Sequence, residues 1–194
     1  MQLEESFELA FPRDAVWAAF KDVPLLVSCL PGASLRSAPG AEPIELVFAV
    51  KLGPITARFV GEGSVCYAED YTGRISGSGA DRATNSRVKG AAAFALLAEA
   101  ESTRVVTRID YTLTGALAQV GRAGIVKEIA ARLTRQFAEN LQARIGERMG
   151  SASPAGMTGS RVPHAHVPKE ESRPVDGGAL VWDVVLGRLK KRKG

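Results

Sequence analysis

The segment from Ala123 to about Arg148 has a helical repeat that no strand can produce. Six apolar side chains recur there at every fourth position: Ile125, Ile129, Leu133, Phe137, Leu141 and Ile145. Polar side chains such as Lys127, Arg135 and Glu139 take the other positions. This spacing gathers the apolar residues on one face of a single long amphipathic helix. Because that face must be buried, the rest of the chain has to supply a surface for it.

Residues 2–11 and most of residues 44–115 show the two-residue repeat of β-strands. In the first segment Leu3, Phe7 and Leu9 alternate with polar side chains, which predicts a half-buried strand. Two short helices are expected next, one after Pro12 and one from about Pro24 to Leu30. Further strands are expected at residues 44–51, 55–60, 64–68, 71–79, 87–98 and 104–115. Because Gly, Asp or Pro separates these runs, they indicate an antiparallel meander.

This order of elements predicts an α+β fold of the helix-grip type. In such a fold a curved antiparallel sheet wraps around the long C-terminal helix. One helix does not fill the whole concave face, so an apolar cavity is expected beside it. We expect the folded domain to cover residues 1–149.

Apolar residues of the concave face and the long helix are candidates for the cavity wall. All of them are core residues in the first place, and the sequence does not separate the two roles. The expected lining is Leu30, Phe48, Phe59, Phe94, Leu96, Ile125, Ile129 and Leu133. Cys29 and Cys66 are expected to be small buried hydrophobic residues, with a lining role for Cys29 left open.

The positive charge of the chain is confined to its end. Residues 1–149 carry 17 basic and 17 acidic side chains, and residues 150–178 carry three of each. Residues 179–194 carry five basic side chains against Asp183 alone. In residues 150–178, 13 of the 29 residues are Gly, Pro or Ser, which predicts a disordered linker. Attraction to a polyanion is therefore expected of the tail and not of the folded domain.

Residues 179–194 join apolar side chains directly to a basic cluster. The segment is too short to span a bilayer but long enough to lie in its interface. We expect contact with an anionic membrane through Trp182, Val185, Leu186, Arg188, Leu189, Lys190, Lys191, Arg192 and Lys193. Docking of this segment on the chain's own domain stays open as an alternative. Nucleic-acid binding is disfavoured, because the domain is neutral and no aromatic residues are interleaved with the charges.

Few residues of the expected domain suggest catalysis or metal binding. The only histidines, His164 and His166, lie in the linker, and there is no P-loop and no HExxH motif. Carboxylates such as Glu99 and Asp110 fall at turns or on the expected solvent face. The absence of a secretory signal and of paired cysteine spacing indicates a cytoplasmic protein.

Several short motifs, in their order and spacing, resemble the family of the carbon monoxide dehydrogenase CoxG subunit, which belongs to the START-like, or SRPBCC, superfamily. The most specific motif is Gly115-Ala116-Leu117-Ala118-Gln119-Val120-Gly121, followed by Arg135-Gln136-Phe137. The others are residues 16–20, the Cys29-Leu30-Pro31-Gly32 turn, residues 52–61, Gly77-Ser78-Gly79 and Gly90-Ala91-Ala92. Ala116 departs from the pattern, because a longer and often basic residue is expected there.

The resemblance covers about residues 1–145 and implies a START/Bet v 1-like fold. It also implies a non-catalytic role beside a molybdenum-containing CO dehydrogenase or a related hydroxylase. That role is recruitment of the enzyme to the inner face of the cell membrane and handling of a lipid or quinone, with menaquinone or ubiquinone as the bound molecule. Two other functions stay open: an assembly factor for that enzyme, and a small cyclase or dehydratase that uses a carboxylate in the cavity. A polar residue buried in the cavity would favour the enzyme, and a wholly apolar tunnel the carrier.

Overall fold

The computed structural model describes residues 1–52, 55–119 and 124–151. Met1–Glu147 form one compact unit. Apart from its first two residues, the predicted linker lies outside the described residues. The whole predicted membrane-contacting segment, from Ala179 to Gly194, lies outside them too.

The described residues form strands and helices in the order expected of a helix-grip fold. The strands are β1 (Gln2–Leu9), β2 (Ala33–Leu35), β3 (Ile44–Leu52), β4 (Ile55–Tyr67), β5 (Thr72–Asp81), β6 (Ser86–Glu99) and β7 (Ser102–Thr114). The helices are α1 (Arg13–Phe20), α2 (Val23–Cys29) and α4 (Ile125–Ser151). The long helix thus begins and ends within three residues of its predicted bounds.

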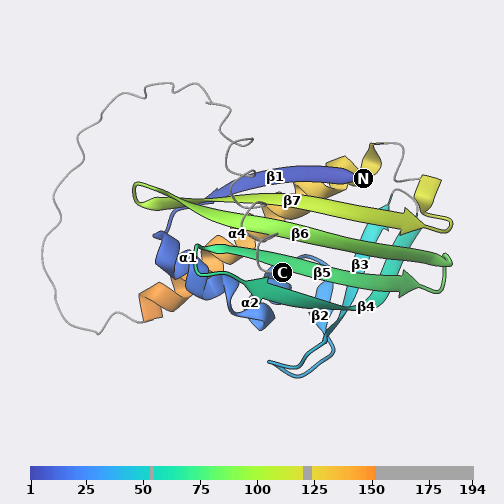
Figure 1. Cartoon of the computed structure of the whole chain (residues 1–194), viewed down its shortest axis with the longest axis horizontal. Helices are drawn as coiled ribbons and strands as arrows, with labels where there is room; N and C mark the ends of the chain where they lie inside the picture. The colour runs from blue at the N-terminus through green and yellow to red at the C-terminus, as the bar shows by residue number, and fades with distance from the viewer. Residues whose placement is uncertain (53–54, 120–123, 152–194) are drawn as a thin grey trace, which may run out of the picture. The chain divides into compact units, whose positions relative to one another are not determined.

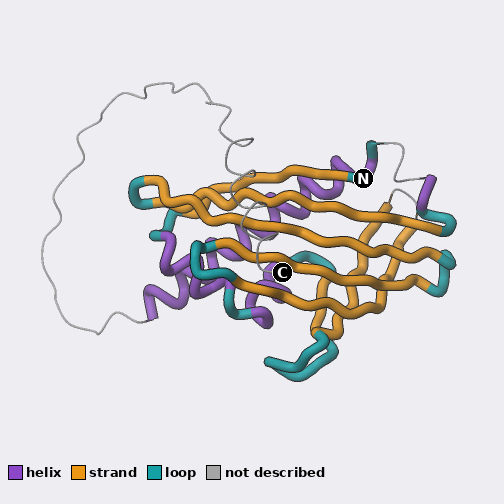
Figure 2. Tube along the Cα trace, viewed as in Figure 1, coloured by secondary structure: helices purple, strands orange, loops and turns teal. Residues whose placement is uncertain are grey.

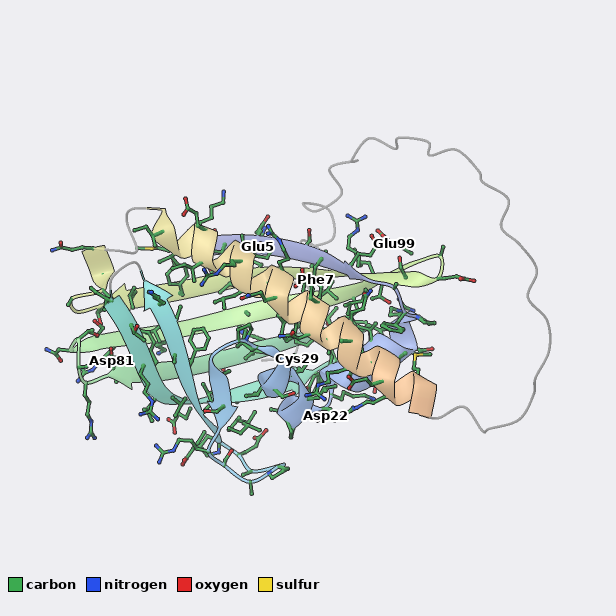
Figure 3. All side chains as sticks on the ribbon, turned by 180° about the vertical axis from the view of Figure 1, so that it is seen from behind. Glu5, Phe7, Asp22, Cys29, Asp81 and Glu99 are labelled. Atoms are coloured by element: carbon green, nitrogen blue, oxygen red, sulfur yellow. The ribbon has the colours of Figure 1, made fainter. Side chains whose placement is uncertain are left out.

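These seven strands form a single antiparallel sheet in the order β1-β7-β6-β5-β4-β3-β2. Neighbours in the chain are neighbours in the sheet from β2 to β7, and β1 closes the order by pairing with β7. The edges of the sheet are therefore β1 and the short β2. Figure 1 shows α1, α2 and α4 on the same face of the sheet, and the view from behind shows α4 crossing that face (Figure 3).

Two details of the predicted strands are wrong. The segments expected at 55–60 and 64–68 are one strand, β4, and the three-residue strand β2 is absent from the prediction. Gly61 and Gly63, which lie between the two predicted segments, are within β4, and the pairing of β4 with β3 and β5 continues through them. Figure 2 shows the strands of the sheet in orange and the turns between them in teal. A Cβ on Gly61 would lie 2.0 Å from the carbonyl oxygen of Ser78, so only glycine allows β4 and β5 to approach this closely.

The alternation of β4 also corrects the prediction for Cys66. This residue is exposed, because it lies on the face of the sheet that the helices do not cover. Cys29, at the end of α2, is buried as predicted.

The main core lies between α1, α2, the last part of α4 and one end of the sheet. Its fully buried members include Leu9, Val16, Cys29, Leu96 and Leu141. An aromatic cluster completes it: the ring of Phe94 lies 5.2 Å from that of Phe20 and 6.4 Å from those of Trp17 and Tyr67, measured between centroids. This packed end holds the two short helices against the sheet and thereby fixes one wall of the cavity described next.

Candidate ligand-binding site

An apolar cavity of about 400 Å³ lies between α2, α4 and the covered face of the sheet. Twenty residues line it, and they come from nine different elements. They are Phe7, Phe20, Val23, Leu26, Val27, Leu30, Ile44, Leu46, Gly63, Ser64, Val65, Ile75, Ala92, Phe94, Thr107, Ile109, Ala130, Leu133, Thr134 and Phe137. The size is within the range of small-molecule sites in proteins.

Helix α2 forms one wall of the cavity, and a side-chain cap holds the start of this helix in place. The Asp22 carboxylate accepts a hydrogen bond from the backbone N–H of Leu25 at 3.0 Å, and Pro24 occupies the first turn. Val23, Leu26 and Val27 then face the cavity, whereas Leu25 is buried in the core. A helix of seven residues with apolar side chains on both faces therefore serves as a partition between the core and the cavity.

Helix α4 forms the opposite wall. Ala130, Leu133, Thr134 and Phe137 line the cavity, at the three- and four-residue spacing of one helix face. Phe137 packs edge-on against Phe7 of β1, with 5.9 Å between the ring centroids.

A hydrogen bond joins the two helical walls. The side-chain amide of Asn140 in α4 donates to the carbonyl oxygen of Cys29, the last residue of α2, at 2.9 Å. It satisfies a carbonyl group that the end of a helix otherwise leaves without an intrahelical partner. The spacing of α2 and α4 is thus set by a polar contact just outside the apolar cavity.

The chemistry of the cavity wall is almost entirely hydrocarbon. The polar residues among the described lining are Ser64, Thr107 and Thr134, and the side chain of Ser64 lies on the same uncovered face of β4 as that of Cys66. The Thr107 hydroxyl donates to the carbonyl oxygen of Glu5 at 3.1 Å, and the Ser64 hydroxyl lies 3.1 Å from that of Ser76. No carboxylate, imidazole, amine or thiol belongs to the described lining. Such a wall suits a neutral apolar ligand with few hydrogen-bonding groups.

Metal-binding side chains are not grouped in the described ranges 1–52, 55–119 and 124–151. No set of three or more His, Cys, Asp or Glu side chains lies close enough there to hold a metal ion.

A second compartment of about 220 Å³ adjoins the cavity. The two share Leu46, Gly63 and Ile75 in their walls. Phe48, Phe59 and Val88 supply the other apolar side chains, and glycines of β4 and β5 form much of the floor. Ile75 is 39% exposed although it faces the helices, so the space is open to solvent where the compartments meet.

Only some of the predicted lining residues lie in the wall of the cavity. Leu30, Phe94 and Leu133 line the cavity, and Phe48 and Phe59 line the second compartment. Leu96 is 2% exposed and lies in the main core. Ile129 packs against the cluster formed by Ala57, Phe59 and Leu117, and Ile125, half-buried at the start of α4, lines neither space.

The helix α2 was predicted, but its contribution to the cavity lining, through Val23, Leu26 and Val27, is the largest omission from the predicted site. The run Val23-Pro24-Leu25-Leu26-Val27 is the signal that could have identified it, since a helix that is apolar all round must be covered on both faces. The residues predicted to touch a membrane lie outside the described part of the chain. Within the described part, no helix is both long enough and apolar enough to cross a bilayer.

Known structures share this architecture at low sequence identity. A conserved protein from Geobacillus kaustophilus matches with a TM-score of 0.63 and 18% identity, over 76% of this chain and 96% of that one. A START superfamily protein from Mycobacterium smegmatis matches with a TM-score of 0.50 and 15% identity, over 76% and 98%. A point mutant of norcoclaurine synthase from Thalictrum flavum matches with a TM-score of 0.54 and 14% identity, over 77% and 96%. These matches confirm the predicted START-like helix-grip fold.

No protein with a curated description matches the sequence significantly. A family model does match it: residues 6–146 fit the model of the carbon monoxide dehydrogenase CoxG subunit. The match contains all seven strands apart from the start of β1, the cavity-forming parts of α2 and α4, and every residue of the cavity wall. The chain belongs to the CoxG family of carbon monoxide dehydrogenase subunits.

Proposed function

We propose that this protein is a non-catalytic carrier that binds a lipid or an isoprenoid quinone in its apolar cavity and serves a molybdenum-containing CO dehydrogenase or a related hydroxylase at the membrane. The observation that carries the proposal is the cavity wall, which has twenty residues and only three hydroxyl groups. The family name supports the partner, because it describes a subunit of carbon monoxide dehydrogenase.

A quinone of the menaquinone or ubiquinone type matches this wall chemically. Its ring and isoprenoid chain are apolar, and each methylene removed from water contributes about 0.8 kcal/mol. The ring has two carbonyl oxygens, for one of which the hydroxyl of Thr134 supplies a donor. The second compartment gives the chain of such a ligand a continuation beyond the main cavity.

An enzymatic role is the rival with the same fold, since norcoclaurine synthase is a structural neighbour. General acid–base catalysis needs a titratable side chain within hydrogen-bonding reach of the reacting atom. The described cavity wall offers only aliphatic hydroxyls, which do not titrate in the physiological range. This difference favours holding and transfer of a ligand over its conversion.

The membrane part of the proposal rests on the sequence of residues 179–194. Five basic residues follow Trp182 and its aliphatic neighbours, and each basic side chain near an anionic leaflet contributes roughly 1 kcal/mol. An apolar ligand that is nearly insoluble in water has to be taken from a bilayer, so a carrier that touches the inner face of the cell membrane is consistent with the cavity.

Titration of the full chain with short-chain analogues of ubiquinone and menaquinone tests the carrier role. The blocking variant is Ala92→Phe, because Ala92 lies in the cavity wall between Ile75 and Ile109 of the neighbouring strands. The matched control is Ala91→Phe, which adds the same ring to the opposite face of β6. Saturable binding that Ala92→Phe removes and Ala91→Phe retains is expected. Absence of saturable binding of both analogues would leave the assembly-factor role.

A further inference from the structure

The three hydroxyl residues that line the cavity differ in what their side chains already bind. The Thr107 hydroxyl donates to the carbonyl oxygen of Glu5 at 3.1 Å. The Ser64 hydroxyl lies 3.1 Å from that of Ser76, on the uncovered face of the sheet. The Thr134 hydroxyl makes no hydrogen bond to any residue that the structure describes. Thr134 is therefore the lining residue that can donate to a ligand without giving up a bond within the described part of the chain.

Thr134 also marks one end of the cavity. It lies one helical turn before Phe137, whose ring contacts that of Phe7 in β1. Phe7 and Thr134 line both the apolar cavity and a groove of about 680 Å³ between β1 and α4. Figure 3 labels Phe7 where β1 passes beside α4. These two side chains thus stand between the inner cavity and the outer surface at the β1 edge of the sheet.

The other end of the cavity lies at the strands β3, β4 and β5, where the second compartment begins. Leu46, Gly63 and Ile75, one from each of these strands, border both spaces. In the order β1-β7-β6-β5, the strands β1 and β5 are three strand spacings apart. At about 4.8 Å for each spacing, this is about 14 Å along the sheet. A ligand that touches Thr134 and reaches the second compartment is therefore elongated.

The surroundings of Thr134 disfavour an anionic head group. The described cavity wall contains no basic side chain. In the described lining of the outer groove Arg135 is the one basic residue, and Glu5 and Glu139 of the same lining oppose its charge. A carboxylate or phosphate would lose its hydration here without a partner cation, which costs far more than burying a neutral carbonyl group that accepts a hydrogen bond. The site therefore suits a neutral acceptor.

We propose that Thr134 orients the ligand: its hydroxyl donates to a carbonyl oxygen at one end of a neutral, elongated molecule, whose apolar chain passes beneath β7 and β6 into the second compartment. The inference rests on the proposed carrier function and adds to it the direction, the charge and the minimum length of the ligand. An isoprenoid quinone with a side chain meets all three conditions, whereas a fatty acid or a quinone ring without a chain does not.

The head-group contact is tested with the full chain and two probes that carry the same chain of two isoprene units. One is a naphthoquinone, and the other is the corresponding naphthalene, which lacks both carbonyl oxygens. Thr134→Val keeps the branched shape of the side chain and removes its hydroxyl. Measured by equilibrium dialysis, this variant should bind the quinone about three- to tenfold more weakly and the naphthalene as before.

Two further variants separate a contact with the ligand from an effect on the fold. Thr107→Val removes a hydroxyl that is already bonded to Glu5, so it should leave the ratio of the two affinities unchanged even if the domain becomes less stable. Thr134→Ser keeps the hydroxyl and should retain the ratio of the unchanged chain.

The direction of the chain is tested by comparing the same quinone with and without its isoprene units. Val88 lines the second compartment, and Val88→Phe fills part of that space. Lys89→Phe adds the same ring to the opposite face of β6 and is the control. In the unchanged chain and the control, the isoprene units should raise the affinity at least tenfold. Val88→Phe should lose most of this gain and bind the quinone without a chain as before.

The outcomes distinguish this inference from the proposed function. If the unchanged chain binds neither quinone saturably, the carrier function fails and the inference fails with it. If it binds the quinone, but Thr134→Val affects the quinone and the naphthalene equally, the role of Thr134 is overturned and the carrier function stands. If the gain from the isoprene units survives in Val88→Phe, the proposed direction of the ligand is overturned.

Discussion

The ring of Phe94 occupies the space in which a side chain at position 73 would begin. The two residues are opposite each other in the pairing of β6 with β5. A Cβ built on Gly73 would lie 2.4 Å from Cζ and 2.7 Å from Cε1 of Phe94. Phe94 is 2% exposed, packs against Phe20 and Trp17, and also lines the cavity. Because Gly73 has no side chain, the ring of Phe94 can take this position and form part of the cavity wall.

Gly73→Ala is expected to destabilise the fold by about 1–3 kcal/mol, which is typical of adding a methyl group to a packed core. The ring of Phe94 is confined by its aromatic neighbours, so the strands have to move apart. Urea denaturation followed by circular dichroism measures the loss. Gly150→Ala is the control, because no heavy atom lies within 4 Å of its added Cβ and alanine favours a helix. Equal urea midpoints for Gly73→Ala and the unchanged chain would show that the ring of Phe94 can move aside without loss of stability.

Tyr67 gives the fold a sensitivity to alkaline pH. Its hydroxyl donates to the carbonyl oxygen of Phe20 at 2.7 Å, and burial, with the Asp22 carboxylate as a second cause, raises the pKa of this hydroxyl. Because the folded pKa lies above the unfolded value of 10.0, the contribution is fully present below pH 10 and is lost as the pH rises through the folded pKa. Tyr67→Phe should cost about 1 kcal/mol at neutral pH. It should also flatten the fall of stability above pH 10, as measured by denaturation at several pH values.

Residual alkaline sensitivity in that variant is expected from two other tyrosines. A hydrogen bond to Asp14 raises the pKa of Tyr71, and burial raises that of Tyr111. An unchanged pH profile in Tyr67→Phe would contradict the role assigned to the contact with Phe20.

The contact of Asn140 with Cys29 should matter for the ligand as well as for stability. Asn140→Ala removes the hydrogen bond between α4 and α2, which should lower the free energy of unfolding by about 1 kcal/mol. Since both helices line the cavity, binding of a quinone analogue should weaken at the same time. Gln136→Ala, at an exposed position of the same helix, should change neither quantity. A loss of stability with unchanged affinity would mean that the cavity does not depend on this spacing.

The fold follows from periodicity, and the details that the prediction missed have local causes. The four-residue repeat of α4 and the alternation of β1 and β7 predict the bounds of those elements to within three residues. Gly61 looks like a strand end, although it is there because β4 passes close to the carbonyl oxygen of Ser78 in another strand. Strand β2 has three residues, too few for a repeat to appear.

The cavity could be predicted as a feature but not residue by residue. The position of α2 determines which residues form the wall of the cavity. That position depends on the Asp22 cap and on Asn140 of α4, which lies more than a hundred residues later in the chain. Leu96 and Phe94 have the same character in the sequence and face the same side of β6, yet Leu96 packs wholly into the core, whereas Phe94 reaches the cavity. Such distinctions depend on the path of the covering helices.

The last prediction concerns residues 179–194, whose basic side chains carry the whole net charge of the protein. Replacing Lys190, Lys191, Arg192 and Lys193 with Gln should weaken sedimentation with anionic vesicles and remove its salt dependence. Replacing Trp182 and Leu186 with Ser should weaken it at every salt concentration, because apolar insertion is not screened.

A matched control separates the position of the charges from their number. Gln at Arg58, Arg74, Arg87 and Lys89 also removes four positive charges, but from positions on strands of the sheet. If the tail is the anchor, this control binds vesicles like the unchanged chain, while the tail variant with the same net charge does not. If both variants lose binding equally, attraction depends on net charge alone and the tail has no special role. If neither loses it, the segment serves another purpose, of which docking to the partner enzyme is the one that its apolar side chains best support.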